Sequence, residues 1–380
     1  MAVKVKDVLK LDMFNNNIKV VTGEKGLDRI IGRVSVFDCP IENDVIDKNI
    51  IGQGDFFVTS LFVVKDSKED MLKLMEILVK SKASGICVIN EYINGFSSEF
   101  IELADEHSFP VFLVDKDIPY ANIIQDITEL IIKDKEDIIG EMKVDKILKT
   151  ESYEKIVEIS HDINNNFMNN FIVLYLTNIN SKSSINYIYE NINSREMWSA
   201  LKYKDGILII MTNSEYAEIQ NLYNYILNLI QNTCKHYVLG ISKFFNDLKH
   251  LKKAIIEAIT SCSFSSILNK NVINYEQLGV YTILVPIKHS VELNEFYNRI
   301  MLPLKNYDKK YNLNLFETIV CFIENDGNFE KTANEMFQHE NTIRYRVTKV
   351  KQILDMEDMN LEFLSQLSIA VKVHKLLMED

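Results

Sequence analysis

The chain has 380 residues, a formal net charge of -12 and a hydrophobic fraction of 47%, a composition typical of globular proteins. This length is too great for one ordinary hydrophobic core, so two or three domains are expected. The opening stretch MAVKVKDVLKLDMF mixes charged and apolar residues, and no window approaches the roughly 18 apolar residues of a membrane span. The sequence therefore argues against a signal peptide or membrane helix and predicts a soluble, cytoplasmic protein.

The cysteines and histidines do not form a metal-binding or disulfide pattern. Five cysteines are scattered along the chain without a CxxC pair, and the seven histidines show no HExxH spacing. Reduced, mostly buried thiols are therefore expected, and neither a metal nor a cofactor is predicted. The cysteines are Cys39, Cys87, Cys234, Cys262 and Cys321.

Residues 1–118 predict a small α/β domain at the N-terminus. Short β-branched or aromatic runs bounded by Gly, Pro or Asp indicate strands, and apolar residues at helical spacing indicate helices between them. Strands that alternate with helices are typical of an α/β fold. The predicted strands are 33–38, 55–64, 85–90 and 110–115, and the predicted helices are 67–82 and 97–108.

Residues 119–166 predict a helical linker. From Ala121 to Asn166 there is almost no strand signal, while isoleucines and then Met142 recur at helical spacing. A long amphipathic helix in this position packs either on its own copy in a dimer or on a domain of its own chain, and the spacing leaves both open. The apolar series is Ile124, Ile127, Ile131, Ile138 and Met142.

Residues 167–290 predict a second α/β domain, with mainly antiparallel strands at 170–178, 206–212, 236–242 and 281–287. Helical spacing is present near 185–200, 215–232 and 246–265. Asp205-Gly206 is a hairpin signal between two strand-like runs. Residues 291–380 read almost entirely as helix.

The C-terminal segment has the layout of a helix-turn-helix. Asn328 can cap a first helix, and Ala333 on that helix is small enough to allow a second helix to cross closely. The turn is predicted at 337–341, and the second helix is predicted to begin at Asn341 or Thr342.

Residue placement at 100° per residue separates two faces of the second helix. The predicted buried stripe is Ile343, Val347, Val350 and Leu354. The opposite face carries amide, hydroxyl and aromatic groups, with arginines on both flanks, as a helix in the DNA major groove requires. These outward residues are Asn341, Thr342, Arg344, Tyr345, Arg346, Thr348, Lys349 and Gln352.

An ordinary surface helix with a solvated basic face is the alternative interpretation. Residues 311–380 contain seven Lys and Arg against twelve Asp and Glu, which is unusual for a nucleic-acid-binding module. The short partner helix and the mixture of base-reading side chains favour DNA binding, with a modest contribution from non-specific electrostatics.

The stretch KTANEMFQHENTIRYRVTKVKQIL resembles the C-terminal helix-turn-helix of the PucR (purine catabolism regulator) and sugar-diacid regulator families. It departs from their pattern at Glu340, where a basic residue is frequent, and in 355–360, which lacks the usual glycine. The resemblance adds His339 to the candidate DNA-binding residues. The matching positions are Thr332, Ala333, Met336, Phe337, His339, Asn341, Thr342, Arg344, Tyr345, Arg346 and Lys349.

The earlier segments are similar to the same families in order: a PucR N-terminal domain, and a degenerate GGDEF-like domain that ends in NYEQLGVYTILVPI. The resemblance implies a ligand-responsive regulator of a metabolic operon, such as one for purine or related nitrogen catabolism. Its implied partners are double-stranded DNA, a small-molecule effector and a second copy of the chain. The alternative is a nucleotide- or metabolite-binding signalling protein with a vestigial helix-turn-helix.

The middle domain is not expected to be an enzyme. A diguanylate cyclase needs a Gly-Gly pair and clustered carboxylates for two divalent ions, whereas the hairpin here offers only Tyr203-Lys204-Asp205-Gly206. A dimerising or transmitting scaffold is the favoured interpretation, with a nucleotide-binding remnant as the alternative.

The N-terminal domain is predicted to sense a small molecule. The turns TGEKGLDR (22–29) and GQGDFFVTS (52–60) expose backbone N–H groups near strand ends, where α/β sheets bind ligands. Alternatively, the glycines only permit tight turns and Asp28–Arg29 is a structural ion pair. The candidate ligand-binding residues are Asp28, Arg29, Asp55, Thr59 and Ser60.

Overall fold

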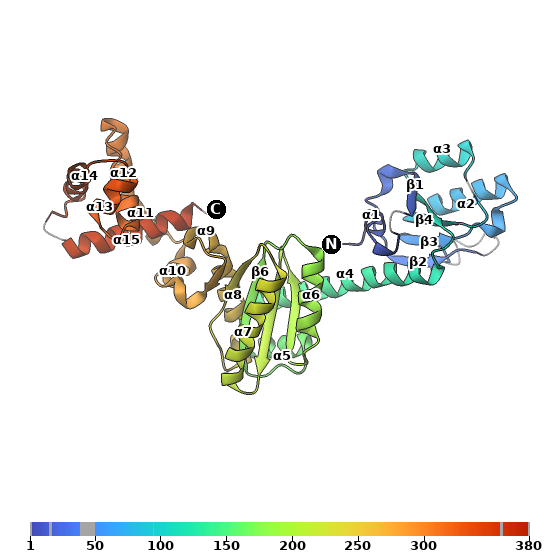
Figure 1. The fold of residues 1–380 in the computed structure, drawn as a ribbon, viewed down its shortest axis with the longest axis horizontal. Coiled ribbons are helices and arrows are strands. Elements are labelled where there is room, and N and C mark those ends of the chain that lie inside the picture. The colour runs from blue at the N-terminus through green and yellow to red at the C-terminus, as the bar shows by residue number, and fades with distance from the viewer. Residues whose placement is uncertain (1, 15–16, 39–49, 94, 358–359, 379–380) are drawn as a thin grey trace. The chain divides into compact units, whose positions relative to one another are not determined.

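The structure, a computed structural model, describes residues 2–14, 17–38, 50–93, 95–357 and 360–378 (Figure 1). The chain divides into two compact units. The first is Met1–Lys149 with Leu201–Lys204, and the second is Thr150–Ala200 with Asp205–Asp380. Two five-stranded sheets and a C-terminal set of helices make up the fold, so the expected combination of two α/β regions and a helical region is confirmed.

The first sheet has the strand order β1-β5-β4-β3-β2, in which β1 is antiparallel to β5 and the other neighbours are parallel. Helices α2 and α3 pack on one face, while α1 and the first half of α4 pack on the other. The elements are α1 (Val5–Val8), β1 (Ile18–Thr22), β2 (Arg33–Val36), β3 (Asp55–Thr59), α2 (Lys68–Lys80), β4 (Gly85–Asn90), α3 (Ser98–Glu106), β5 (Val111–Asp115) and α4 (Tyr120–Lys149).

Most elements of this unit follow their local sequence. The five residues of β3 are all buried, as is typical of a strand inside a parallel sheet. The predicted strand 55–64 is too long, because Leu61 adopts a left-handed conformation (φ 55°) that redirects the chain. Strand β1 was missed because it is mostly half-buried and carries Lys19 within a short run. Cys39 lies outside the described residues, and the other four cysteines are free and buried.

The predicted helix over 121–166 is interrupted and forms two helices, α4 and α5 (Tyr153–Ile163). Ser152 caps α5 by accepting a hydrogen bond from the Lys155 N–H. Near its start, α4 buries Ile123, Ile127 and Ile131 in the N-terminal core. The N-terminal structural unit therefore continues well past residue 118.

The second sheet has the order β10-β9-β6-β8-β7. Strand β6 is antiparallel to both β8 and β9, as predicted, whereas β10 is parallel to β9. The predicted hairpin is confirmed, with Lys204 and Asp205 as its two-residue turn. The strands are β6 (Asn170–Thr177), β7 (Trp198–Tyr203), β8 (Gly206–Asn213), β9 (Val238–Ile241) and β10 (Val272–Asn274).

Helices α6 (Lys182–Asn193) and α7 (Tyr216–Thr233) cover one face of this sheet, and α8 (Leu251–Ser263) packs against β6 and β9. The approach of α8 requires Gly240, because a Cβ there would lie 2.1 Å from the Ala258 carbonyl oxygen. The predicted strand 281–287 is wrong: α10 (Tyr281–Leu284) and a 3₁₀ turn (Val285–Ile287) occupy it. Periodicity cannot distinguish such a short apolar run from a buried helical turn.

The C-terminal region is helical, as predicted, and its helices share one hydrophobic core. None of the helices in the described ranges is long and apolar enough to cross a membrane. The helices are α11 (Val291–Tyr311), α12 (Leu315–Glu324), α13 (Phe329–Glu335), α14 (Glu340–Ile353) and α15 (Asn360–Leu377).

Candidate nucleic-acid interface

Helices α13 and α14 form the predicted helix-turn-helix. The Asn328 side chain accepts a hydrogen bond from the Lys331 N–H and caps α13, as expected. Ala333 is buried at the contact with α14, where its small side chain permits close packing. Helix α14 in turn buries Ile343, Val347 and Val350, while Leu354 is half-buried.

Helix α14 begins at Glu340, earlier than predicted. Its cap is His339, whose Nδ1 accepts a hydrogen bond from the Asn341 N–H at 3.2 Å. Asn341 and Thr342 therefore lie inside the first turn, with Asn341 exposed and Thr342 half-buried. Their side chains do not serve as the caps that the sequence suggested.

The turn between the helices ends α13 with a Schellman motif. The Gln338 N–H donates to the Ala333 carbonyl at 2.9 Å, and the Phe337 N–H donates to Asn334 at 3.3 Å. This geometry places Phe337 at φ 53°, a left-handed conformation that usually selects glycine. The Phe337 side chain is 93% exposed, so the turn presents a bare aromatic ring.

The outward face of α14 agrees with the predicted helical wheel. Tyr345 is 58% exposed, and Asn341, Thr348 and Gln352 are also exposed. The Thr348 hydroxyl donates to the Arg344 carbonyl at 2.9 Å and can still accept a bond from outside. A face with amide, hydroxyl and phenol groups has the donors and acceptors that base edges require.

The cations of α14 do not occupy equivalent positions. Arg344 is exposed and donates to Glu340 Oε1, with Nε at 2.9 Å, and its guanidinium lies 4.3 Å from the Phe329 ring centroid. Arg346 is half-buried and donates from Nη1 to Thr318 Oγ1 on α12 at 3.1 Å. Lys349 is half-buried and donates to Gln352 Oε1 at 3.3 Å. Arg344 is thus the more available arginine, while Arg346 ties α14 to α12.

Helix α14 ends without the glycine that the family pattern led us to expect. Asp355 takes the left-handed position (φ 57°), and the Met356 N–H donates to the Lys351 carbonyl at 2.9 Å. The short polar Asp side chain tolerates this conformation better than most residues do, so the same type of helix end is retained.

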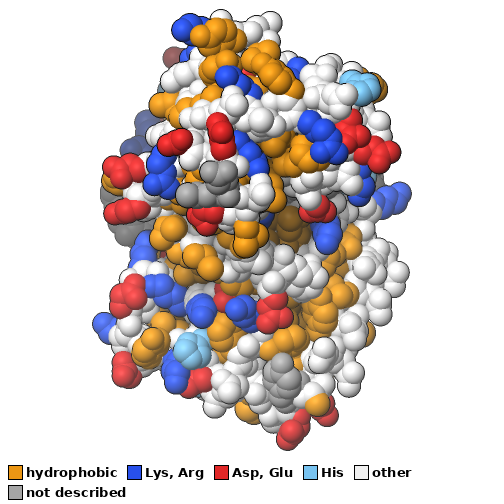
Figure 2. All heavy atoms as spheres, turned by 90° about the vertical axis from the view of Figure 1, so that its left-hand side faces the viewer, with side chains coloured by type: hydrophobic (Ala, Val, Ile, Leu, Met, Phe, Trp, Pro, Cys, Tyr) orange, Lys and Arg blue, Asp and Glu red, His pale blue; other side chains and the backbone are white. Residues whose placement is uncertain are grey.

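Positive charge is not concentrated into one patch on the face shown in Figure 2, where Lys and Arg side chains are interspersed with acidic and hydrophobic ones. This distribution agrees with the acidic balance of the C-terminal segment.

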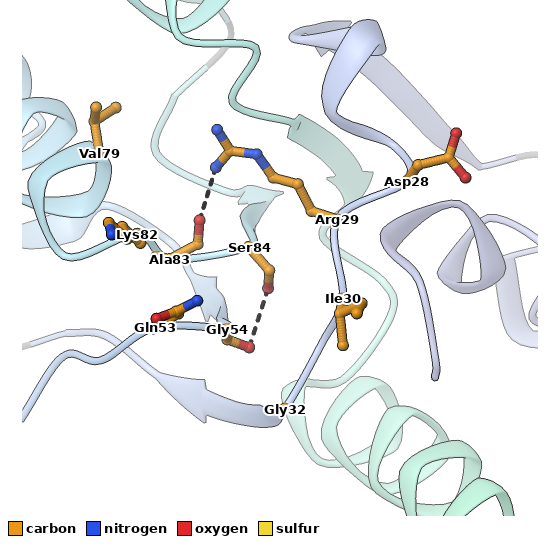
Figure 3. Close-up of a pocket in the computed structure, with 10 residues that line it drawn as sticks. All are labelled: Asp28, Arg29, Ile30, Gly32, Gln53, Gly54, Val79, Lys82, Ala83 and Ser84. Atoms are coloured by element: carbon orange, nitrogen blue, oxygen red, sulfur yellow. Dashed lines mark hydrogen bonds between the residues drawn. The ribbon is translucent and has the colours of Figure 1, made fainter. Parts of the chain in front are cut away.

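The candidate ligand residues of the N-terminal unit separate into two groups at opposite ends of β3. At the end where the parallel strands begin, which we call the amino edge, lies a cavity of about 750 Å³ that Asp28, Arg29 and Gly54 help to line (Figure 3). At the other end, which we call the carboxyl edge, lie Thr59 and Ser60.

The charged residues near the amino edge already have partners. Arg29 donates to the carbonyls of Ala83 at 2.8 Å and His107 at 2.7 Å. Asp28 pairs with Lys6 and Lys4, whose hydrogen bonds and charges lower the pKa of its carboxyl to about 2. Asp28 and Arg29 therefore bond to other groups instead of forming the suggested ion pair with each other.

Asp55 is buried at the start of β3 and pairs with the guanidinium of Arg33, with Nε at 3.0 Å. Its carboxylate also accepts a hydrogen bond from the Gly52 N–H at 2.9 Å. These bonds compensate the buried charge of Asp55, so its carboxylate stabilises the fold at this end of the sheet.

The carboxyl edge has unsatisfied polar groups. Thr59 Oγ1 donates to Asp38 at 2.9 Å. Asn90 ends β4, and Tyr120 begins α4. Asn90 Oδ1 and the Tyr120 hydroxyl are buried and complete no hydrogen bond in the described ranges, although Ser60 and Asp38 lie close to that hydroxyl. Burial raises the pKa of Tyr120 to about 12, so its hydroxyl remains a donor at neutral pH. Sequence reasoning missed Asn90 and Tyr120 because neither stands in a glycine-rich turn.

Comparisons with known proteins identify both ends of the chain. Residues 7–131 match the purine catabolism regulatory protein-like family, and residues 315–373 match the PucR C-terminal helix-turn-helix domain. Both ends of the chain therefore match models of the PucR family. This is a family of transcription regulators, which agrees with the expectation that the chain is not an enzyme.

Three curated relatives, all from Bacillus subtilis (strain 168), show distant similarity. The proline-responsive transcriptional activator PutR is 31% identical over 32% of this chain and 30% of its own length. The DNA-binding transcriptional activator AdeR is 23% identical over 43% of this chain and 42% of its own length. The purine catabolism regulatory protein is 26% identical over 32% of this chain and 22% of its own length. The matches thus span less than half of each relative.

A solved structure, the regulator of polyketide synthase expression from Bifidobacterium adolescentis, matches with a TM-score of 0.32 and 14% identity. That match covers 63% of this chain and 93% of the other. The TM-score is too low to indicate a shared overall fold.

The unequal positions of the two arginines predict unequal effects on stability. Arg346→Ala and Thr318→Val should each lower the local free energy of unfolding by about 1 kcal/mol, because each removes the bond between α12 and α14. Arg344→Ala should change it by only about 0.5 kcal/mol, because its pair with Glu340 lies within one exposed helix face and its contact with the Phe329 ring is near the surface. Hydrogen exchange of α12 and α14 amides measures both. Equal effects of the two arginine substitutions would contradict this distinction.

The left-handed turn predicts that Phe337→Gly stabilises the C-terminal helices by about 1 kcal/mol, since glycine has no Cβ to strain the backbone and an exposed ring loses no burial. Asp355→Gly is the control, with a smaller expected gain because Asp tolerates this conformation. Denaturant unfolding monitored by C-terminal amide exchange measures the change. A destabilised Phe337→Gly variant would show that the ring packs in the folded domain.

Proposed function

We propose that this protein is a ligand-responsive DNA-binding regulator of a metabolic operon, with α14 as the helix that reads the DNA major groove. The observation that carries the proposal is the outward face of α14, where Asn341 and Tyr345 are exposed opposite a fully buried apolar stripe. Named relatives that include transcriptional activators support it.

Different residues of α14 would contact different parts of the DNA. Asn341 and Tyr345 would meet base edges, with Thr348 beside them, whereas His339 and Thr342 lie near the N-terminus of α14, where backbone N–H groups favour phosphate. Arg344 would contact a phosphate after exchanging its weak pair with Glu340. Arg346 and Lys349 would act mainly by holding or flanking the helix, since both have partners within the domain.

Base-preference measurements test this proposal. Selection of binding sites from a random DNA library should yield a preferred sequence for the full-length protein, and Asn341→Ala or Tyr345→Ala should change the preference at one or two positions. Each lost base contact should reduce discrimination by about 1–3 kcal/mol. Lys372→Ala on α15 is a control outside the proposed surface. If neither substitution changes the selected sequence, α14 does not read bases through these residues.

The N-terminal unit is proposed to hold the effector at its carboxyl edge. Thr59, Ser60, Asn90 and Tyr120 supply hydroxyl and amide groups there, and two of them have an unsatisfied buried polar atom. Ligands of parallel α/β sheets bind at this edge of the strands, and buried polar groups normally have partners. Purine breakdown products and amino acids are the first classes to test, given the names of the relatives.

Thermal unfolding of the full-length protein tests the effector site. A compound at about 100 times its dissociation constant should stabilise the protein by about 2.7 kcal/mol. Tyr120→Phe and Asn90→Ala should weaken that stabilisation, whereas Tyr92→Phe, an exposed control, should not. If an effector stabilises all these variants equally, it binds away from the carboxyl edge.

The second half of α4 is proposed to carry self-association, and the central sheet is proposed to be a non-catalytic, GGDEF-like scaffold. Ile139 and Met142 are 53% and 55% exposed, with Ile132 and Ile138 on the same side of the helix. A continuous exposed apolar stripe on a long helix is typical of a helix–helix interface.

Sedimentation tests this interface. Ile139→Asp should shift the protein from dimer to monomer, because a carboxylate would have to be buried between the two helices. Ile256→Asp on α8 is the matched control, since Ile256 is similarly exposed but lies outside the stripe. A dimer that is unaffected by Ile139→Asp would place self-association elsewhere.

A further inference from the structure

A second cavity lies beside the central sheet, at a place that the DNA-binding and effector proposals do not use. Its volume is about 470 Å³, within the range of small-molecule sites. The start of α5, helix α8 and the segment after β10 provide its lining. The apolar part of that lining is Tyr153, Ile156, Ile256, Tyr275, Val285 and Pro286.

Glu257 is the most deeply buried charged side chain of this lining, with 2% of its surface exposed. Its Oε2 accepts a hydrogen bond from the Lys243 N–H at 3.0 Å. Its Oε1 is buried without a hydrogen-bond partner in the described part of the chain. Burial raises the pKa of this carboxyl, so the site disfavours the charged form until a donor or cation arrives.

Close packing explains why the chain cannot easily satisfy this oxygen. Gly240 allows α8 to lie against β9, and Glu257 stands one residue before the contact at Ala258. Glu257 is buried beside this contact, and its Oε2 is held by the Lys243 N–H. An oxygen placed in this way can accept a hydrogen bond from a donor outside the chain.

Two lysines of the lining have hydrogen-bond or ion-pair partners other than Glu257 Oε1. Lys252 donates to the Thr150 carbonyl at 3.1 Å and to Glu151 at 2.6 Å. Lys249 pairs with Asp247 at 2.8 Å. Lys253 lies one helical turn before Glu257 and contributes a favourable charge, yet Oε1 has no bond from it. The rim is basic, while the deep acceptor is unsatisfied.

We propose that this cavity binds a small organic amine or N–H heterocycle, which donates to Glu257 Oε1 and packs its apolar body between Ile256, Tyr275 and Val285. The ligand would be held by one directional bond at depth and by apolar contact near the opening, the usual division in small-molecule sites. This site is separate from the carboxyl edge of the N-terminal unit, so either site can exist without the other.

Calorimetry on the full-length protein tests the proposal with defined probes: cyclohexylamine, phenethylamine, tyramine and imidazole. The matched controls for the amines are cyclohexyl methyl ether, phenethyl methyl ether and 4-methylanisole, which keep an apolar body but have neither an N–H nor an O–H to donate. We expect binding by at least one amine or N–H probe and a dissociation constant at least about ten-fold weaker for the controls, because a hydrogen bond to a charged group is lost.

Glu257→Gln keeps an acceptor for the Lys243 N–H but places an amide in the carboxylate position. It should weaken amine binding at least about ten-fold. Glu151→Gln is the matched control, since it removes the same charge from the exposed rim and should leave binding within about two-fold of the unmodified protein. Ile256→Lys, at a 46% exposed position that does not endanger folding, should also weaken binding by adding a repelling charge.

Three results would overturn the proposal: no probe of the amine class binds, Glu257→Gln binds the probes as the unmodified protein does, or Ile256→Lys leaves their affinity unchanged. Loss of amine binding in Tyr120→Phe but not in Glu257→Gln would assign it to the N-terminal unit instead. Failure of the DNA or effector proposals would leave these outcomes unaffected.

Discussion

The burial of one apolar stripe on α14 determines what the C-terminal helices can present to a partner. Ile343, Val347 and Val350 are inserted in the shared core, and each such side chain contributes about 1.5–3 kcal/mol. The Arg344–Glu340 pair contributes about 0.3–0.5 kcal/mol, as expected for an exposed pair within a helix. The rotation of the helix is therefore set by its apolar residues, and Arg344 can change partners at little cost to the stability of the fold.

This constraint explains how an acidic chain can present a face of polar side chains suited to base edges on one helix. The apolar stripe turns Asn341 and Tyr345 outward whatever the net charge of the domain. Specificity comes from such side chains at base edges, whereas phosphate contacts mainly supply affinity and position. The cations of α14 all have hydrogen-bond partners, namely Glu340, Thr318, Gln352 and Asn360. The electrostatic affinity for DNA is therefore expected to be modest and contact with bases correspondingly important.

Features that depend on periodicity could be predicted from the sequence. The wheel of α14, the cap at Asn328 and the hairpin at Asp205 follow from local spacing and residue type, and the structure agrees. Two kinds of feature were not predictable. The position of Arg346 depends on a distant partner, Thr318 in another helix. The cap at His339 is local, but several neighbouring polar residues could have formed it.

The scarcity of glycine is a second reason why the structure differs from what the sequence predicts. The chain has 12 glycines in 380 residues. Phe337 and Asp355 occupy left-handed positions at helix ends, where glycine is the usual residue. In the N-terminal unit, the glycine-rich turn at 52–60 led to the prediction that Asp55 and Thr59 belong to one ligand site. These residues lie at opposite ends of one strand, about 13 Å apart at 3.3 Å per residue. Sheet topology, which sequence spacing alone does not give, separates the two edges.

The salt dependence of DNA affinity reports how many phosphates α14 neutralises, so it is a direct test of whether this helix binds DNA. Arg344→Ala is expected to weaken binding to every sequence and to lower the slope of log K against log salt by about 1 for each helix bound. Glu340→Gln, which frees Arg344 from its pair, should strengthen binding. An unchanged slope in Arg344→Ala, together with unchanged affinity in Glu340→Gln, would contradict the assignment of α14 as the DNA-reading helix.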